Sequence, residues 1–125
     1  MLKLSKKQDY ALVLMSKLSN SSHPISLNVV AGEANLPLSI LRQLANKLRQ
    51  AGLISSKEGV GGGYWVAVDP KTISFAQIIT AVDGPIALTD CASCQNKGCQ
   101  TSPQVRKINA EIIEKLHSIK LDKLD

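Results

Sequence analysis

Residues 38–52, LSILRQLANKLRQAG, have the clearest amphipathic-helix pattern in the sequence. Its apolar residues recur at the i, i+3, i+4, i+7 spacing of a single helix face, which must lie against a core: Leu41, Leu44, Ala45 and Leu48. The other positions between Leu41 and Gln50 carry polar and basic side chains without a carboxylate, and Gly52 is placed to end the helix. We therefore expect a helix from Leu38 to Ala51 with a donor-rich outer face.

Two shorter helices are expected before it. Ser5 and Gln8 form a capping box, and the apolar residues that follow repeat at helical spacing, which predicts a first helix over residues 6–18. Ser26 is placed to cap a short second helix. The Asn-Leu-Pro sequence at 35–37 is expected to end this helix before the third begins.

A β-hairpin is expected after the third helix. Two β-leaning runs, residues 53–57 and 64–68, flank a glycine-rich turn at 58–63. Two short helices, a basic helix and a hairpin are the order of a winged helix-turn-helix. The predicted fold is thus mainly α with a small β-hairpin.

Two further helices are expected beyond the hairpin. Ser74 and Gln77 form a second capping box that opens a helix through Val82. A last helix runs from Ser102 to about Ile119, with one apolar seam that suits a partner helix: Val105, Ile108, Ile112, Leu116 and Ile119. We expect a DNA-binding domain over 1–84, a cysteine-rich loop over 85–101, and a dimerisation helix with its tail over 102–125.

Composition narrows the function classes. Fifteen Lys and Arg against ten Asp and Glu give a net charge of +5, which favours an anionic partner such as nucleic acid. The sequence contains neither a membrane span nor a signal peptide, so the cytoplasm is expected. Because we find no catalytic Ser/His/Asp set or paired carboxylates, we expect no enzyme and no small-molecule substrate.

The basic helix and the hairpin carry the expected contacts with double-stranded DNA. Arg, Lys, Asn and Gln have the donor patterns that read base edges in the major groove, whereas a merely solvated helix face is the alternative. The predicted contact residues lie on the third helix, the wing and the start of the first helix: Ser39, Arg42, Gln43, Asn46, Lys47, Lys57, Gly61, Gly62, Tyr64, Lys6 and Lys7.

Every cysteine lies in one short segment, at Cys91, Cys94 and Cys99. An odd number in a single cluster argues against a disulfide framework and for metal, cluster or redox chemistry. The C-x-x-C spacing occurs in both zinc and iron–sulfur sites, and three unligated thiols are the alternative. Both histidines are far away in the sequence, at His23 and His117.

Four segments carry a resemblance to a known family: LKLSK…DYA from residue 2, LISS…GGGY from residue 53, I…VDGPIALT from residue 78, and the cysteines followed by RKIN at 106–109. With them the chain resembles the IscR/NsrR-type bacterial winged-helix regulators, most closely the branch that regulates the SUF iron–sulfur assembly genes. The resemblance implies a homodimer paired through the last helix, with the third helix in the major groove and the wing at the minor groove. It also implies an iron–sulfur cluster, commonly [2Fe–2S], on three cysteines and one other ligand, whose occupancy changes DNA binding.

Several positions depart from the family pattern. The cysteines are more closely spaced than usual, and Ser102 stands where some relatives have a histidine ligand. Asp9 matches an aspartate that another branch supplies from the partner chain, so Asp9 is the expected fourth ligand. Glu58 replaces an arginine before the wing, and Arg42 replaces a glutamate that reads DNA in one relative.

Two other functions remain open at this point. The cysteines could form a thiol switch through disulfide exchange in a DNA-binding regulator. Alternatively, the chain could be a metal-free winged-helix module that binds a protein partner.

Overall fold

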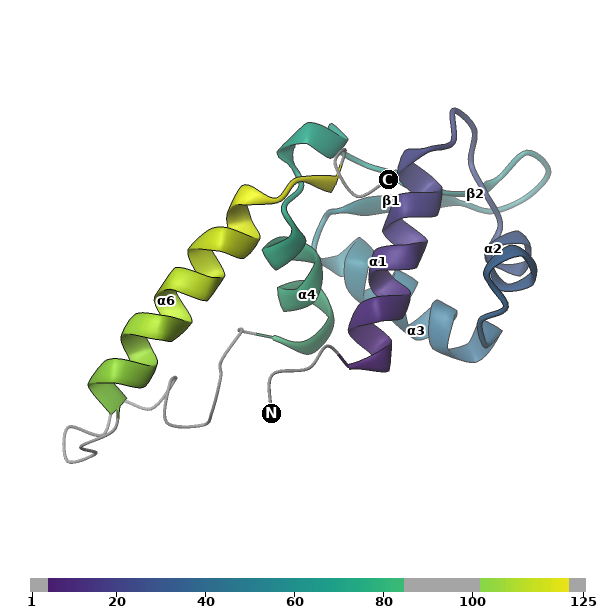
Figure 1. Cartoon of the computed structure of the whole chain (residues 1–125). Helices are drawn as coiled ribbons and strands as arrows, with labels where there is room; N and C mark the ends of the chain where they lie inside the picture. The colour runs from purple at the N-terminus through teal and green to yellow at the C-terminus, as the bar shows by residue number, and fades with distance from the viewer. Residues whose placement is uncertain (1–4, 85–101, 122–125) are drawn as a thin grey trace.

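The computed structural model describes residues 5–84 and 102–121, and Figure 1 shows α1 to α4 packed together beside the hairpin, with α6 projecting from them. In chain order the elements are α1 (Lys6–Ser19), α2 (Leu27–Ala34), α3 (Leu38–Gln50), β1 (Ile54–Lys57), β2 (Gly63–Val66), a 3-10 turn η1 (Pro70–Thr72), α4 (Phe75–Asp83) and α6 (Ser102–Ser118). The predicted mainly α fold with a small hairpin is confirmed. Within these described ranges, each helix is too short or too polar to cross a bilayer.

The helices begin where the sequence predicts. The Ser5 hydroxyl accepts from the backbone N–H of Gln8 at 3.2 Å, and the Gln8 side chain accepts from the N–H of Ser5 at 2.9 Å. Ser74 and Gln77 repeat this capping box at α4. Ser26 caps α2 by accepting from the N–H of Val29. Each cap satisfies backbone donors that have no partner inside the helix.

The turn between α2 and α3 is set by two residues. Asn35 ends α2 in the left-handed conformation, at φ 55° and ψ 49°, which Asn tolerates better than most residues. Pro37 is the N-cap of α3, and its extended backbone turns the chain into the new helix. At the other end α3 stops at Gln50, one residue before the predicted end, because Ala51 is already the C-cap.

The hairpin is anchored to the connection between α1 and α2. β1 and β2 are antiparallel, with Ile54 opposite Val66 and Lys57 opposite Gly63. The backbone of Tyr64 also pairs with that of Ile25, through hydrogen bonds of 2.8 and 2.9 Å. β1 lacks the first residue of the predicted run 53–57, and β2 begins one residue before the predicted run 64–68 and ends at Val66.

The core is built from the inner faces of α1 to α4, the first strand and one residue from the C-terminal segment. The predicted stripe of α3 is buried, as is the inner face of α1. The side chain of Leu121 also belongs to the core, at 1% exposure. Two backbone hydrogen bonds of 2.8 Å, Phe75 N–H to Ile119 and Leu121 N–H to Ile73, hold this segment beside the start of α4.

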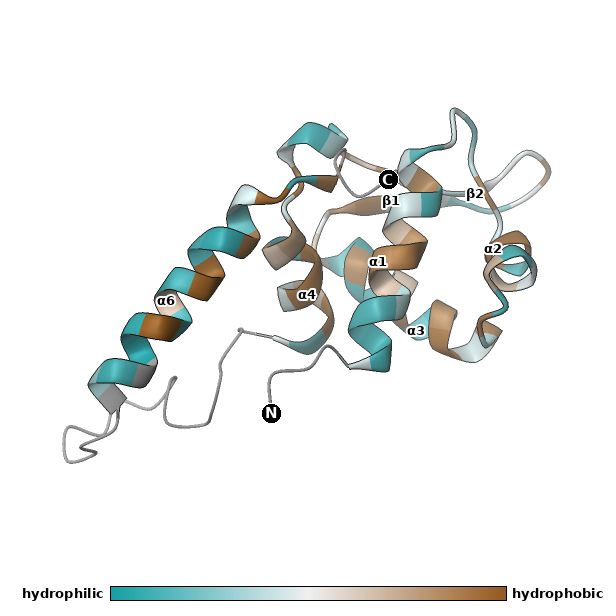
Figure 2. Cartoon of the chain, in the orientation of Figure 1, coloured by the Kyte–Doolittle hydropathy of each residue, from teal (hydrophilic) through white to brown (hydrophobic). Residues whose placement is uncertain are grey.

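Part of the α6 seam, which suits a partner helix in sequence, packs within the same chain. The C-terminal half of α6 packs on α4 of the same chain, and Ile112 and Leu116 are half-buried there. Farther along, Ile108 is 50% exposed. Figure 2 shows apolar positions recurring between hydrophilic ones as α6 leaves the winged domain. Among the seam residues whose side chains the structure describes, Ile108 is the one left exposed.

Candidate nucleic-acid interface

The outer face of α3 is exposed along its whole length and bears no carboxylate. Its long side chains carry amide, guanidinium and ammonium donors, and the exposed residues are Ser39, Arg42, Gln43, Asn46, Lys47, Arg49 and Gln50. Arg49 and Gln50 were not among the predicted contacts, although the same helical spacing places them on this face. Because the opposite stripe is buried, the rigid core fixes which way these donors point.

Two residues of this face, Arg49 and Asn46, are hydrogen-bonded to each other. The Arg49 guanidinium donates to the side-chain oxygen of Asn46 at 3.1 Å, one helical turn away. This contact engages the amide oxygen of Asn46 and leaves its N–H groups as donors for another molecule.

Lys47 differs from its neighbours on α3. Its ammonium donates to the backbone carbonyl oxygen of Val82 at 2.9 Å, in the last turn of α4. Lys47 therefore lies at the edge of the exposed face that adjoins α4, and its charge is directed at the protein.

The first turn of α1 lies at the same end of α4. The Ser5 hydroxyl donates to the carboxylate of Asp83 at 3.0 Å, and Asp83 directly follows Val82. Lys6 and Lys7 are exposed on this turn, so their positive charge lies near the α4 edge of α3. The sequence alone did not place them there.

The wing has the tight turn that its glycines predict. A side chain on Gly62 would collide with the backbone carbonyl of Lys57, and one on Gly63, at φ +141°, would collide with the backbone of Ile25. Lys57 and Gly61 are exposed, and so is Glu58, whose carboxylate repels phosphate. The turn thus offers one cation and a bare backbone.

Tyr64 has a structural task in this wing. Its half-buried side chain packs against the core, while its backbone pairs with Ile25. The structure therefore places Tyr64 at the base of the wing, and a contact between its side chain and DNA stays a prediction.

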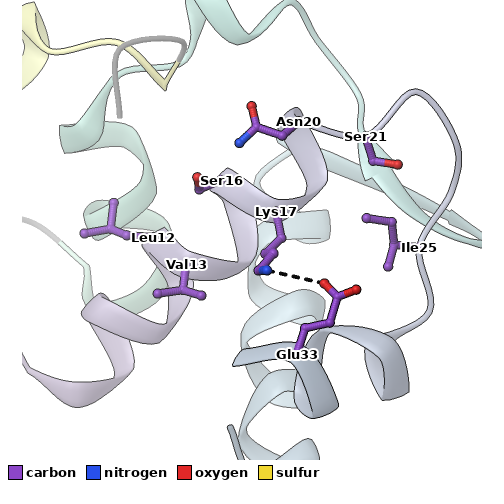
Figure 3. Close-up of a pocket in the computed structure, with 8 residues that line it drawn as sticks. All are labelled: Leu12, Val13, Ser16, Lys17, Asn20, Ser21, Ile25 and Glu33. Carbon is purple, nitrogen blue, oxygen red and sulfur yellow. Dashed lines mark hydrogen bonds and ion pairs between the residues drawn. The ribbon is translucent and has the colours of Figure 1, made fainter. Parts of the chain in front are cut away.

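A shallow hollow of 650 Å³ lies between α1 and α2. Figure 3 shows the ion pair between Lys17 and Glu33 across this hollow. The ammonium of Lys17 is 3.3 Å from the Glu33 carboxylate, in a pair that is too exposed to contribute much stability. Leu12 and Val13, from the same helix as Lys17, also line the hollow. Because its charge is matched by Glu33, Lys17 is not a free cation for phosphate.

The predicted metal site falls largely outside the described residues. Cys91, Cys94 and Cys99 all lie there, whereas Asp9 is exposed on the first turn of α1. Over residues 5–84 and 102–121, the structure groups no three His, Cys, Asp or Glu side chains in a way that could hold a metal ion. His117 is engaged elsewhere, with its Nδ1 atom 3.2 Å from the Ser74 hydroxyl. Thiolates are the ligands that iron–sulfur clusters require, and Asp9 is an exposed carboxylate, so ligation by these four residues stays a prediction.

A helix-turn-helix followed by a wing, with a donor-rich face free of carboxylates on the recognition helix, is the architecture of winged-helix DNA-binding regulators. The chain belongs to the Rrf2 family of iron-dependent transcriptional regulators, whose family model matches residues 4–124. The predicted resemblance is thereby confirmed at the level of the family.

Individual relatives can be aligned with this chain over nearly its whole length. The transcriptional regulator IscR of Vibrio vulnificus strain YJ016 is 36% identical over 132 aligned residues, which cover 98% of this chain and 77% of its own. Among solved structures, CymR, the global cysteine regulator of B. subtilis, has a TM-score of 0.83 at 32% identity, covering 99% of this chain and 96% of its own. IscR of T. potens has a TM-score of 0.81 at 32% identity, covering 98% and 85%.

Proposed function

We propose that this chain is a homodimeric regulator of transcription that binds double-stranded DNA through α3 and the wing, with an affinity set by the state of Cys91, Cys94 and Cys99. The observation that carries the DNA-binding part is the exposed, carboxylate-free face of α3. Membership of a family of transcriptional regulators supports the same function.

The proposed contacts divide by chemistry. Gln43 and Asn46 lie on the exposed face of α3 and read base edges in the major groove, and Arg42 contacts guanine or phosphate. Ser39 lies in the first turn of α3 and donates to a phosphate. The remaining contacts hold the backbone without reading sequence: Lys6, Lys7 and Lys57 through charge, and Gly61 and Gly62 through the bare wing turn.

Salt dependence tests the DNA-binding part. A duplex is first selected from a random pool, and its dissociation constant is then measured by fluorescence anisotropy across a salt series. Affinity should fall linearly on a log–log plot, and Arg42→Met should weaken binding about tenfold and reduce the slope by about one. Lys71→Met, on the exposed turn η1, is the matched control and should leave both unchanged. Salt-independent or absent binding would instead support a protein-interaction module.

We also propose that the three cysteines and Asp9 hold a [2Fe–2S] cluster. A bound cluster supplies a one-electron redox centre and cross-links the segments that ligate it. On the protein side, the thiolates of one chain provide three ligands, and Asp9 of its partner in the dimer provides a carboxylate from the exposed first turn of α1. Zinc is the competing metal, because C-x-x-C also binds zinc.

A thiol switch is the second candidate. The fold is shared at nearly equal TM-score by an IscR and by the cysteine regulator CymR, so the fold by itself does not select an iron–sulfur sensor. Cys91 and Cys94 are close enough in sequence to exchange disulfides with Cys99.

Spectroscopy on anaerobically purified protein separates these candidates. A visible chromophore with matched iron and sulfide supports the cluster, and zinc in a colourless sample supports a zinc site. A colourless, metal-free protein after reconstitution supports the thiol switch. Cys94→Ala should abolish the chromophore, and Asp9→Asn should shift it. Survival of both colour and DNA response in Cys94→Ala would refute ligation by three cysteines.

The proposed targets are iron–sulfur assembly genes, and the proposed location of the protein is the bacterial cytoplasm. The support is the resemblance to the SUF-regulating branch and the similarity to IscR proteins. Duplexes from upstream of such genes in the source genome should compete with the selected duplex, whereas scrambled duplexes of the same composition should not.

A further inference from the structure

The last turn of α4 joins two other parts of the chain. The carbonyl of Val82 is among the last four of the helix, which have no partner inside it. The ammonium of Lys47 supplies that partner at 2.9 Å, from a helix 35 residues earlier in sequence. A cation at the C-terminal end of a helix also interacts favourably with the helix dipole. The contact therefore fixes the edge of α3 against the end of α4.

The start of α1 is held to the same turn. A carboxylate at the C-terminal end of a helix, such as Asp83, is disfavoured by the helix dipole. It is compensated here by the N-terminal end of α1, where the Ser5 hydroxyl donates to Asp83 at 3.0 Å. Ser5 also caps α1 by accepting from Gln8, so a shift of Asp83 disturbs the first turn of α1.

We propose that Lys47 is a positioning residue: through Val82 it sets α3 against the end of α4 and carries the state of the cysteines to the DNA-reading face. Cys91 follows Asp83 by only eight residues. The coupling step rests on the proposed function of the cysteines, whereas the positioning of α3 rests on the Lys47–Val82 contact alone.

Its place on the helix distinguishes Lys47 from the DNA contacts. At about 3.6 residues per turn, Lys47 lies nearer the buried stripe of α3 than Gln43 and Asn46, which lie close to the centre of the exposed face. To reach a phosphate, its ammonium would have to leave the carbonyl of Val82, a residue only 2% exposed. The sequence placed Lys47 among the DNA contacts because it recorded the residue type and not this partner.

Salt dependence tests the positioning role. Lys47→Met keeps the aliphatic stem and removes the ammonium, and Arg42→Met is the matched variant on the same helix. We expect the log–log salt slope of DNA binding to be unchanged in Lys47→Met and to fall by about one in Arg42→Met. A fall of about one in Lys47→Met would make Lys47 a phosphate contact and overturn the proposal.

A second measurement tests the coupling. The dissociation constant for DNA is measured on metal-free, reduced protein and on the same protein after anaerobic reconstitution with iron and sulfide or after thiol oxidation. The ratio of the dissociation constants in the two states should move toward one in Lys47→Met. Lys47→Arg, which keeps a cationic donor, should restore the wild-type ratio. Arg42→Met should weaken both states and keep the ratio. A wild-type ratio retained in Lys47→Met overturns the coupling.

Failure of the proposed sensing function and failure of the positioning role give different results. A wild-type protein with the same affinity in every state refutes both the proposed sensing function and the coupling, while the salt slope still decides the positioning role. Urea unfolding confirms that Lys47→Met is folded. Amide hydrogen exchange should then be faster at residues 82–84 in this variant, and unchanged exchange there would contradict the junction.

Discussion

The backbone N–H of Leu121 donates to the carbonyl oxygen of Ile73 over 2.8 Å, which ties the segment after α6 to the residue before the α4 cap. The neighbouring bond from Phe75 to Ile119 has the same length. Through these two bonds the base of α6 is fixed on the winged domain. In a dimer paired through α6, they would fix how each recognition helix is held relative to the dimer axis.

Truncation of Leu121 should destabilise the winged domain itself. Its side chain is 1% exposed within the core, so Leu121→Ala should lower the free energy of unfolding by about 2–4 kcal/mol through lost burial and a cavity. Urea unfolding at fixed protein concentration measures this loss. Val68→Ala, at a residue 44% exposed, is the control and should change it far less. A loss equal to that of the control would mean that Leu121 is not part of the core in solution.

The cap of α4 should be worth more than the cap of α2. The Ser74 hydroxyl is buried, accepts from the N–H of Gln77 at 3.1 Å and lies 3.2 Å from Nδ1 of His117. Ser74→Ala removes both contacts and leaves the Gln77 N–H without its cap, at a cost of about 1–2 kcal/mol of unfolding free energy. Ser26→Ala removes one exposed cap and should cost about 1 kcal/mol or less. Equal losses in the two variants would argue against the His117 contact.

The wing should not accept a side chain at Gly62. An alanine there would collide with the carbonyl of Lys57, so Gly62→Ala should distort the turn and weaken DNA binding about tenfold in the anisotropy measurement. Gly32→Ala is the control, because Gly32 lies in α2 with open space around it. That variant should bind DNA normally and gain about 0.5–1 kcal/mol of stability from helix propensity. Normal DNA binding by Gly62→Ala would exclude the wing from the interface.

The exposed part of the α6 seam should decide the oligomeric state. Ile108 is 50% exposed, and a charge there would have to be buried against the partner helix. Ile108→Glu should therefore convert a dimer to a monomer in sedimentation equilibrium, at concentrations where the wild type is dimeric. Lys115→Glu changes an exposed residue of the same helix and should leave the dimer intact. A dimeric Ile108→Glu variant would place the dimer interface elsewhere.

Features set by neighbours in the sequence were predictable. The caps at Ser5, Ser26 and Ser74 were predicted and are present, because a cap depends on residues within one helical turn. The buried stripe of α3 was predicted for the same reason, since a helix places residues three and four apart on one face. The donor-rich face opposite that stripe follows from the same periodicity.

The contacts that organise the site were decided by the tertiary structure alone. Lys47 meets Val82, Ser5 meets Asp83, and Leu121 meets Ile73 across 35 or more residues, and such separations leave no periodic pattern in the sequence. The residue type of Lys47 suggested a DNA contact, whereas its position beside an unpaired helix carbonyl gives it a protein partner. The sequence by itself thus determined which faces exist and what chemistry they carry. Packing of the helices determined which protein partners those side chains have, such as the Val82 carbonyl for Lys47, because contacts between segments distant in sequence form only in the folded chain.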